Sequence, residues 1–200
     1  MKRIITIGRE FGAGGGTLGR RLAKELGIEY YDRDIILATA KASAHLTPEQ
    51  VRQWDERVPK EFGFTQSLFN FYSKPLGEEL WNAQVHAIRE LADKESCVIV
   101  GRCADHVLAG TERLVRIFIY ADMEARIQRI REKGYYEEHE IARNIRRMDR
   151  ERRDYHRYYT GKEWENVENY DMMLNSGVLG TDGCVECILS YLKIRGLYPA

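Results

Sequence analysis

The sequence predicts an α/β fold, a five-stranded parallel sheet with helices on both faces. Short apolar, β-branched runs predict the five strands, at 3–7, 29–31, 97–100, 115–120 and 170–174. Segments with helical spacing of apolar residues separate these runs, and such alternation is typical of parallel strands joined by crossover helices. A glycine-rich segment directly follows the first strand. Ligands of such sheets bind where the strands end, so a site is expected at this edge.

Local sequence signals place each predicted element. The first helix, 17–26, has Leu18, Leu22 and Leu26 on one face, and Gly27 ends the pattern. Residues 97–100 are apolar at every position, as in a strand buried on both faces. Asp122 is expected to cap the helix that follows it. The other helices are predicted at 34–44, from Thr47 onward, and at 78–93, 123–130, 137–157 and 182–194.

Composition excludes several classes of function. The 200 residues suit a single domain, and 31 Lys and Arg balance 31 Asp and Glu. This zero net charge disfavours a generally basic nucleic-acid binder. No apolar run approaches the roughly 20 residues that span a bilayer, and the N-terminus lacks the apolar stretch of a signal peptide. We therefore expect a cytoplasmic protein, and the aromatic segment 59–77 makes a homodimer plausible.

The glycine-rich segment is Gly12-Ala13-Gly14-Gly15-Gly16-Thr17. Glycines allow positive φ angles and let several backbone N–H groups converge on one anion, and the following helix adds its positive N-terminal end. The alternative is a flexible turn. The standard pattern GxxxxGK[ST] is not matched, because Gly15 stands where its lysine would fall. A dinucleotide-binding GxGxxG is matched only in its first half, since Thr17 replaces the third glycine.

Five segments together resemble the cytidylate kinase-like family. They are 5–7 followed by 12–18, Gly8-Arg-Glu-Phe-Gly12, Tyr30-Tyr-Asp-Arg33, Val98-Ile-Val-Gly-Arg102, and Tyr170-Asp171. The resemblance implies a P-loop NTPase-type three-layer fold in one domain, 1–200, with a helical insert at about 32–95 and an Arg-rich lid at about 134–162. It also implies ATP and Mg²⁺ as cofactors and γ-phosphoryl transfer to a nucleoside monophosphate such as CMP or dCMP, or to another small acceptor.

The segment 143–157 is rich in arginine, the side chain best suited to bind phosphate groups. On a helix, one face carries Arg143, Arg146, Arg147 and Arg150, beside an apolar stripe of Ile141, Ile145 and Met148. A solvated charged helix is the alternative. The resemblance makes this segment the lid, with Arg150, Arg153 and Arg147 as the predicted catalytic residues.

The resemblance also distributes binding roles. Arg102 is expected to bind the phosphate of the monophosphate, and Asp32 and Arg33 to hold the acceptor nucleotide. Gln84 is a candidate contact to the edge of its base. The loop residues Gly12, Ala13, Gly14, Gly15, Gly16 and Thr17, with Arg9, are expected to bind ATP, and Thr17 is also the predicted contact for Mg²⁺.

Gly15 in the position of the lysine leaves several functions open. An arginine can supply the missing charge, with Arg9 and Arg20 flanking the loop. Alternatively, the protein binds nucleotide as a sensor or pseudokinase without turnover, since loss of one charge-stabilising donor costs roughly 10²–10³ in rate. A kinase with a different acceptor is a third hypothesis, because the segment 59–77 is unlike the monophosphate-binding part of cytidylate kinases. A fourth hypothesis is a dinucleotide-dependent oxidoreductase.

Overall fold

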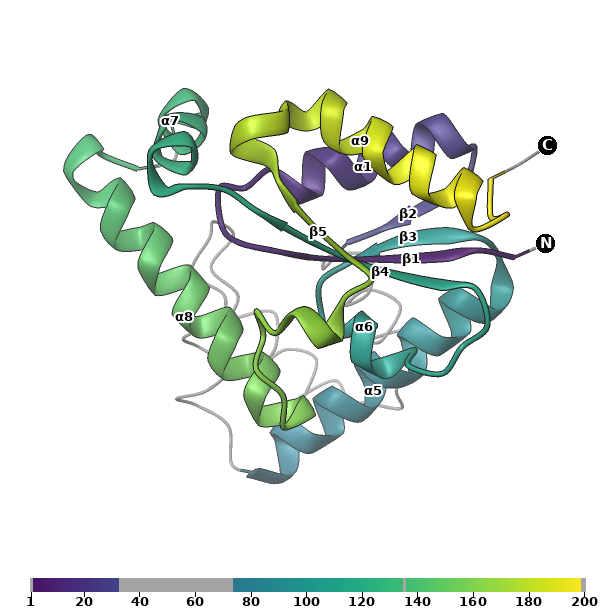
Figure 1. The fold of residues 1–200 in the computed structure, drawn as a ribbon. Helices are drawn as coiled ribbons and strands as arrows, with labels where there is room; N and C mark the ends of the chain where they lie inside the picture. The colour runs from purple at the N-terminus through teal and green to yellow at the C-terminus, as the bar shows by residue number, and fades with distance from the viewer. Residues whose placement is uncertain (1, 33–73, 135, 199–200) are drawn as a thin grey trace.

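Five parallel strands form one sheet with the order β2-β3-β1-β4-β5 (Figure 1). The structure is a computed structural model that describes residues 2–32, 74–134 and 136–198. Every strand pair in the sheet is parallel, so the predicted sheet is confirmed. The strands are β1 (Ile4–Arg9), β2 (Glu29–Tyr31), β3 (Cys97–Val100), β4 (Leu114–Tyr120) and β5 (Met172–Asn175).

Helices cover both faces of the sheet, which gives three layers (Figure 1). Within the described residues, the helices are α1 (Gly15–Leu26), α5 (Lys74–Lys94), α6 (Ala104–Val107), α7 (Met123–Lys133), α8 (Ile141–Thr160) and α9 (Ser176–Ile194). Two short 3₁₀ helices, η1 and η2, span Glu138–Glu140 and Val167–Asn169. The helices α1 and α9 lie on one face, and α5 and α6 lie on the other.

The apolar core forms on both sides of the central strands. Ile5 and Ile7 of β1 pack with the buried leucines of α1 and the apolar side of α9. Ile4 and Ile99 point to the opposite face and pack against α5 and α6. Successive residues of a strand alternate between faces, so a strand covered on both sides needs an apolar residue at nearly every position. This explains the continuous apolar runs in the sequence.

Several helix boundaries differ from the sequence prediction. The first helix begins at Gly15 rather than at residue 17. The last begins at Ser176 rather than at residue 182, because the side chain of Asn175 caps it by accepting hydrogen bonds from the N–H groups of Gly177 and Val178. Gly180, at φ 66° and ψ −179°, breaks the helical geometry inside α9 and hides this early start in the sequence. The short helix α6 was not predicted.

Some predicted segments lie outside the described residues. They are the helix at 34–44, the helix that starts at Thr47, and the aromatic segment 59–77 except for its last four residues, which belong to α5. Within the ranges that are described, no helix is both long enough and apolar enough to cross a membrane.

Candidate active site

The loop between β1 and α1 leaves a row of backbone N–H groups without partners in the helix. Gly12 and Gly14 have φ angles of 82° and 81°, and Gly14 is the N-cap of α1 without a side-chain capping bond. The Ala13 N–H donates to the Glu10 carbonyl at 3.3 Å, and the next N–H that binds within the loop is that of Leu18, which donates to the Gly14 carbonyl at 3.0 Å. The N–H groups of residues 14–17 therefore remain available, and together with the helix dipole they attract an anion.

Buried side chains from distant elements hold the loop in this shape. The Phe11 N–H donates to Oδ1 of Asp149 in α8 at 2.7 Å. The Ser176 hydroxyl donates to the Ala13 carbonyl at 2.7 Å, and Arg129 donates to Ser176. The carbonyls of Gly12 and Ala13 thus accept hydrogen bonds from Arg129 and Ser176, while the N–H groups of the first turn stay free. The loop shape depends on tertiary contacts as well as on its glycines.

An ionic network lies beneath the loop. Arg126 of α7 is 6% exposed and pairs with both Asp149 and Glu10. Glu10 also accepts a hydrogen bond from the Ala121 N–H at 3.0 Å, and burial raises the pKa of its carboxyl. A Cβ atom on Gly12 would lie 3.0 Å from Cβ of Arg126, so α7 packs directly against the loop backbone.

The side chain of Arg9 crosses directly over Gly15. A Cβ atom on Gly15 would lie 2.6 Å from Cβ and 2.8 Å from Cγ of Arg9. A Cβ atom on Gly101 would lie 1.9 Å from Nη1 of Arg9, so the guanidinium rests against the residue that follows β3. Burial, with the charge of Arg152 as the next cause, lowers the pKa of Arg9 to about 9. Arg9 therefore remains a cation at pH 7, in surroundings that disfavour the charge.

Arg152 of α8 also contacts the residues that lead into the loop. Its Nη1 donates to the Arg9 carbonyl at 2.8 Å, and its guanidinium lies 5.5 Å from the centre of the Phe11 ring. Burial lowers the pKa of Arg152 to about 10. Sequence reasoning missed this residue, yet a signal exists. Arg152 continues the apolar stripe of Ile141, Ile145 and Met148 at helical spacing, so a charge there must face inward.

Arg102 stands at the end of β3 on unusual backbone. Gly101, Arg102 and Cys103 all have positive φ angles, of 82°, 59° and 53°, and such strain in non-glycine residues is concentrated at functional sites. The Arg102 guanidinium lies 5.7 Å from the centre of the Tyr155 ring. Buried Gln84 donates from Nε2 to the Tyr155 hydroxyl at 3.2 Å. The predicted substrate residues Arg102 and Gln84 therefore meet on one tyrosine of α8.

Asp32 lies beside the first turns of α1. Its carboxylate accepts a hydrogen bond from Arg20 at 3.0 Å, and the Arg20 guanidinium lies 5.0 Å from the centre of the Tyr30 ring. The Tyr30 hydroxyl reaches the backbone of the loop, 3.8 Å from where a Cβ atom on Gly16 would be. Arg33, predicted as its neighbour in substrate binding, lies outside the described residues.

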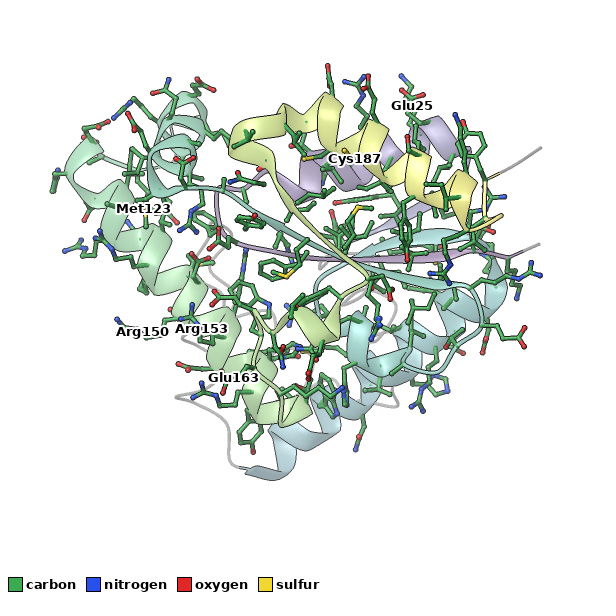
Figure 2. All side chains as sticks on the ribbon, in the orientation of Figure 1. Glu25, Met123, Arg150, Arg153, Glu163 and Cys187 are labelled. Atoms are coloured by element: carbon green, nitrogen blue, oxygen red, sulfur yellow. The ribbon has the colours of Figure 1, made fainter. Side chains whose placement is uncertain are left out.

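The three predicted catalytic arginines of α8 are not brought to the loop. Arg150 is exposed on the side of the helix turned away from the sheet (Figure 2). Arg153 pairs with Glu165 at 2.7 Å, and Nη2 of Arg147 donates to Oδ1 of Asn144 at 3.1 Å. Sequence reasoning chose the face of α8 with most arginines, whereas the inward face carries the one that reaches the loop.

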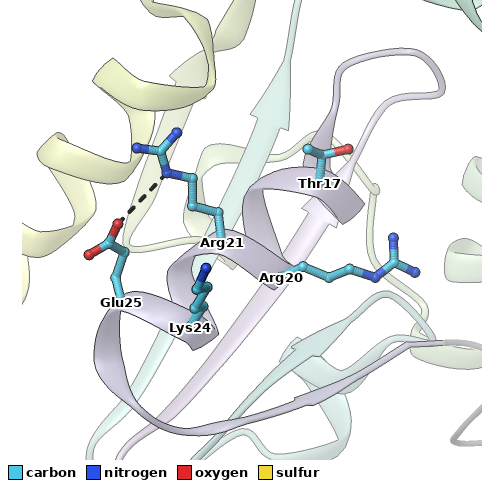
Figure 3. Close-up of a pocket in the computed structure, with 5 residues that line it drawn as sticks. All are labelled: Thr17, Arg20, Arg21, Lys24 and Glu25. Atoms are coloured by element: carbon cyan, nitrogen blue, oxygen red, sulfur yellow. Dashed lines mark ion pairs between the residues drawn. The ribbon is translucent and has the colours of Figure 1, made fainter.

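Thr17 is exposed in the first turn of α1 and lines an open hollow along the outer side of this helix (Figure 3). The other lining residues are Arg20, Arg21, Lys24 and Glu25. Among the residues described, no group of three or more His, Cys, Asp or Glu side chains is placed to hold a metal ion. The single hydroxyl of Thr17 fits Mg²⁺, which binds mainly through nucleotide phosphates and water and needs few protein ligands.

Comparisons with known proteins agree with this geometry. The chain is 25% identical over 193 residues to a cytidylate kinase of Archaeoglobus fulgidus, covering 96% of this chain and 95% of the relative. A solved structure described as an uncharacterized protein from Eubacterium ventriosum has a TM-score of 0.75 at 26% identity, covering 96% and 99% of the two chains.

More distant solved structures share the fold. Shikimate kinase from Bacteroides thetaiotaomicron has a TM-score of 0.56 at 17% identity, covering 96% of this chain and 98% of its own. The predicted fold, a P-loop-type α/β sandwich around a five-stranded parallel sheet, is therefore confirmed. The model of the cytidylate kinase-like family matches residues 4–178. This chain belongs to the cytidylate kinase-like family.

Proposed function

We propose that this protein is an ATP-dependent phosphotransferase that moves the γ-phosphoryl group of ATP to a nucleoside monophosphate of the CMP or dCMP type. The observation that supports this most strongly is the set of three arginines beside the open loop. Arg9, Arg102 and Arg152 come from β1, the end of β3 and α8. Burial is the main cause that lowers the pKa of Arg9, and the charges of Arg152 and Arg102 lower it further. Such mutual repulsion is relieved when a polyanion binds among the arginines.

The loop is the proposed site of the ATP phosphates. The N–H groups of residues 14–17 converge there without competition from a side chain at Gly15 or Gly16. Mg²⁺ would be held by the phosphates with the hydroxyl of Thr17, where it would neutralise phosphate charge. Arg152 lies on the lid helix and contacts the loop. We therefore assign to it the transition-state role that was predicted from the sequence for Arg150, Arg153 and Arg147.

The acceptor site is proposed on the other side of the arginines. Arg102 would bind the phosphate of the monophosphate, with Tyr155 as a support for its guanidinium. Gln84 donates a hydrogen bond to the hydroxyl of the same tyrosine and would hold the Tyr155 ring in place beside Arg102. Asp32 and Arg33 remain the proposed contacts to the acceptor nucleotide.

The chemistry requires positioning more than acid–base catalysis. An ionised oxygen of the acceptor phosphate forms a bond to the γ-phosphorus as the bond to the β,γ-bridging oxygen breaks. The electron pair of the broken bond stays on ADP, and the products are ADP and a nucleoside diphosphate. No proton is removed from the acceptor at pH 7, so catalysis consists of alignment and charge neutralisation.

A second function is favoured by one observation, Gly15 in place of a lysine. In that case the protein binds ATP and closes its lid without transferring phosphate, or transfers it to a small acceptor of another class. The experiment that separates these functions is transfer from γ-labelled ATP with Mg²⁺ to CMP, dCMP, UMP, AMP and GMP, each compared with a reaction lacking acceptor. Labelled CDP or dCDP supports the proposal, whereas no labelled diphosphate from any acceptor contradicts it.

A further inference from the structure

Arg9 and Gly15 occupy one space that can hold only a single side chain. Any residue with a Cβ atom at position 15 would meet Cβ of Arg9 at 2.6 Å and its Cγ at 2.8 Å, distances that non-bonded carbons do not tolerate. Gly15 is itself buried, so the conflict has no outlet into solvent. The arginine at position 9 can therefore take this path only because position 15 has no side chain.

The guanidinium of Arg9 reaches from the loop to the end of β3. It starts from the last residue of β1, passes over the first residue of α1 and reaches Gly101 at the end of β3. That path leads from the phosphate-binding loop toward Arg102, the proposed contact for the acceptor phosphate. A group transferred between donor and acceptor has to cross the same interval.

The backbone of Arg9 is fixed, while the described residues give its charged end no ion pair. Its carbonyl accepts the hydrogen bond from Arg152. Within residues 2–32, 74–134 and 136–198, no carboxylate comes within 4 Å of the guanidinium as a salt-bridge partner, and Asp32 acts on it only at longer range. A partly buried cation without a close carboxylate carries a desolvation cost, which an anion bound beside it would offset.

We infer that Arg9 supplies the phosphate-binding cation that kinases with this type of loop take from a lysine at the position of Gly15. The charge thus enters from the end of β1 instead of from the first turn of α1. This inference rests on the proposed function, because Arg9 is assigned to the β- and γ-phosphates of bound ATP. There it neutralises the charge that develops on the bridging oxygen as the bond to the γ-phosphorus breaks.

The matching test exchanges the two positions. Arg9→Gly removes both the cation and the Cβ atom that blocks position 15, and Arg9→Gly/Gly15→Lys introduces a lysine into the cleared space. Arg89→Ala, which removes an exposed arginine on α5, is the control for losing one positive charge. Transfer from γ-labelled ATP and affinities for ATP and AMP are measured for each full-length protein, with circular dichroism to show that each folds.

We expect Arg9→Gly to lower kcat for transfer by about 10²–10³-fold. The substitution should also reduce the affinity for ATP at least 10-fold more than the affinity for AMP. The exchanged variant is expected to recover at least 10-fold in kcat, and Arg89→Ala to match the unaltered protein. An Arg9→Gly variant within threefold of the unaltered protein in both kcat and ATP affinity overturns the inference. A folded exchanged variant no better than Arg9→Gly also overturns it, because the two cations are then not equivalent.

A further variant tests the steric half of the inference. Gly15→Ala alone should reduce ATP affinity by at least 10-fold, because the new Cβ atom displaces Arg9. In the Arg9→Gly background the same substitution should change ATP affinity by less than twofold, and equal effects in both backgrounds overturn the inference. If the unaltered protein transfers no phosphate but its ATP affinity depends on Arg9 in this way, the proposed function fails and the inference stands.

Discussion

The carboxylate of Asp149 accepts a hydrogen bond from the backbone N–H of Phe11 at 2.7 Å, across 138 positions of the sequence. The same carboxylate pairs with buried Arg126. One side chain of α8 thus ties the loop to α7 and α8. The first half of α8 also packs on Phe11 through Ile145 and Met148, so the loop and α8 form one packed unit.

Asp149→Ala should destabilise the fold strongly. The substitution leaves buried Arg126 with Glu10 at 3.5 Å as its remaining carboxylate partner and with a 3.4 Å hydrogen bond to the Phe11 carbonyl. Breaking a buried ion pair on one side costs about 3–5 kcal/mol. Urea denaturation should show a decrease of about 3 kcal/mol in the free energy of unfolding. Glu165→Ala breaks the exposed pair with Arg153 and should cost less than about 1 kcal/mol. Equal losses in the two variants would show that the Asp149 network does not stabilise the fold.

Arg152→Ala should impair phosphoryl transfer more than Arg150→Ala does. The guanidinium of Arg152 lies beside the loop, whereas that of Arg150 is exposed on the far side of α8. Removal of one charge-stabilising donor lowers kcat by about 10²–10³-fold. Steady-state kinetics with γ-labelled ATP give the comparison, and a larger loss for Arg150→Ala would restore the arginine assignment made from the sequence.

Arg9→Met should raise the stability of the nucleotide-free protein. Burial, followed by the charge of Arg152, lowers the pKa of Arg9 to about 9. Because the folded-state pKa lies below the unfolded value, the cost of burying the charge is present at every pH below about 9 and disappears only above it.

Methionine keeps the apolar length of the side chain without the charge. At pH 7 the melting temperature should therefore rise by about 2–4 °C, which corresponds to about 1 kcal/mol for a chain of this size. The further increase that saturating ATP gives the unaltered protein should shrink. Differential scanning calorimetry with and without ATP measures both, and a lower melting temperature without ATP would show that the Arg9 charge stabilises the empty fold.

Gly12→Ala should weaken phosphate binding through the backbone. The φ angle of 82° costs a residue with a Cβ atom about 1–2 kcal/mol, and that atom would press on Arg126 at 3.0 Å. The loop then moves and its N–H groups diverge. We expect a loss of at least 10-fold in ATP affinity by calorimetry. Gly27→Ala is the matched control, since its φ of 61° gives similar strain at the far end of α1 with nothing within 4 Å of the new Cβ.

The sheet and the loop could be predicted from the sequence because both depend on local patterns of residues. Strands such as 97–100 are apolar at every position, and the glycines from 12 to 16 follow a strand and open a helix. The predicted start of α9, residue 182, was wrong because Gly180 interrupts the helical pattern.

The arrangement of the arginines could not be predicted in the same way. On α8 the arginines are densest on the exposed face, so counting favoured Arg147 and Arg150 over Arg152. The apolar stripe, which Arg152 continues, marks the inward face in the sequence, and the packing of that stripe against Phe11 brings Arg152 to the loop. The path of Arg9 over Gly15 joins the end of one strand to the start of a helix across a turn. Local spacing does not specify that contact.

The central claim is that the loop at residues 12–17, with Arg9 and Arg152, binds the phosphate chain of ATP. Isothermal titration calorimetry of the full-length protein with Mg²⁺ and ATP, ADP or AMP tests it most directly. Because each added phosphate reaches further N–H groups and guanidinium groups, ATP should bind at least 100-fold more tightly than AMP, with ADP between them. Equal affinities for the three nucleotides would contradict the claim, since binding would then owe nothing to the phosphate chain.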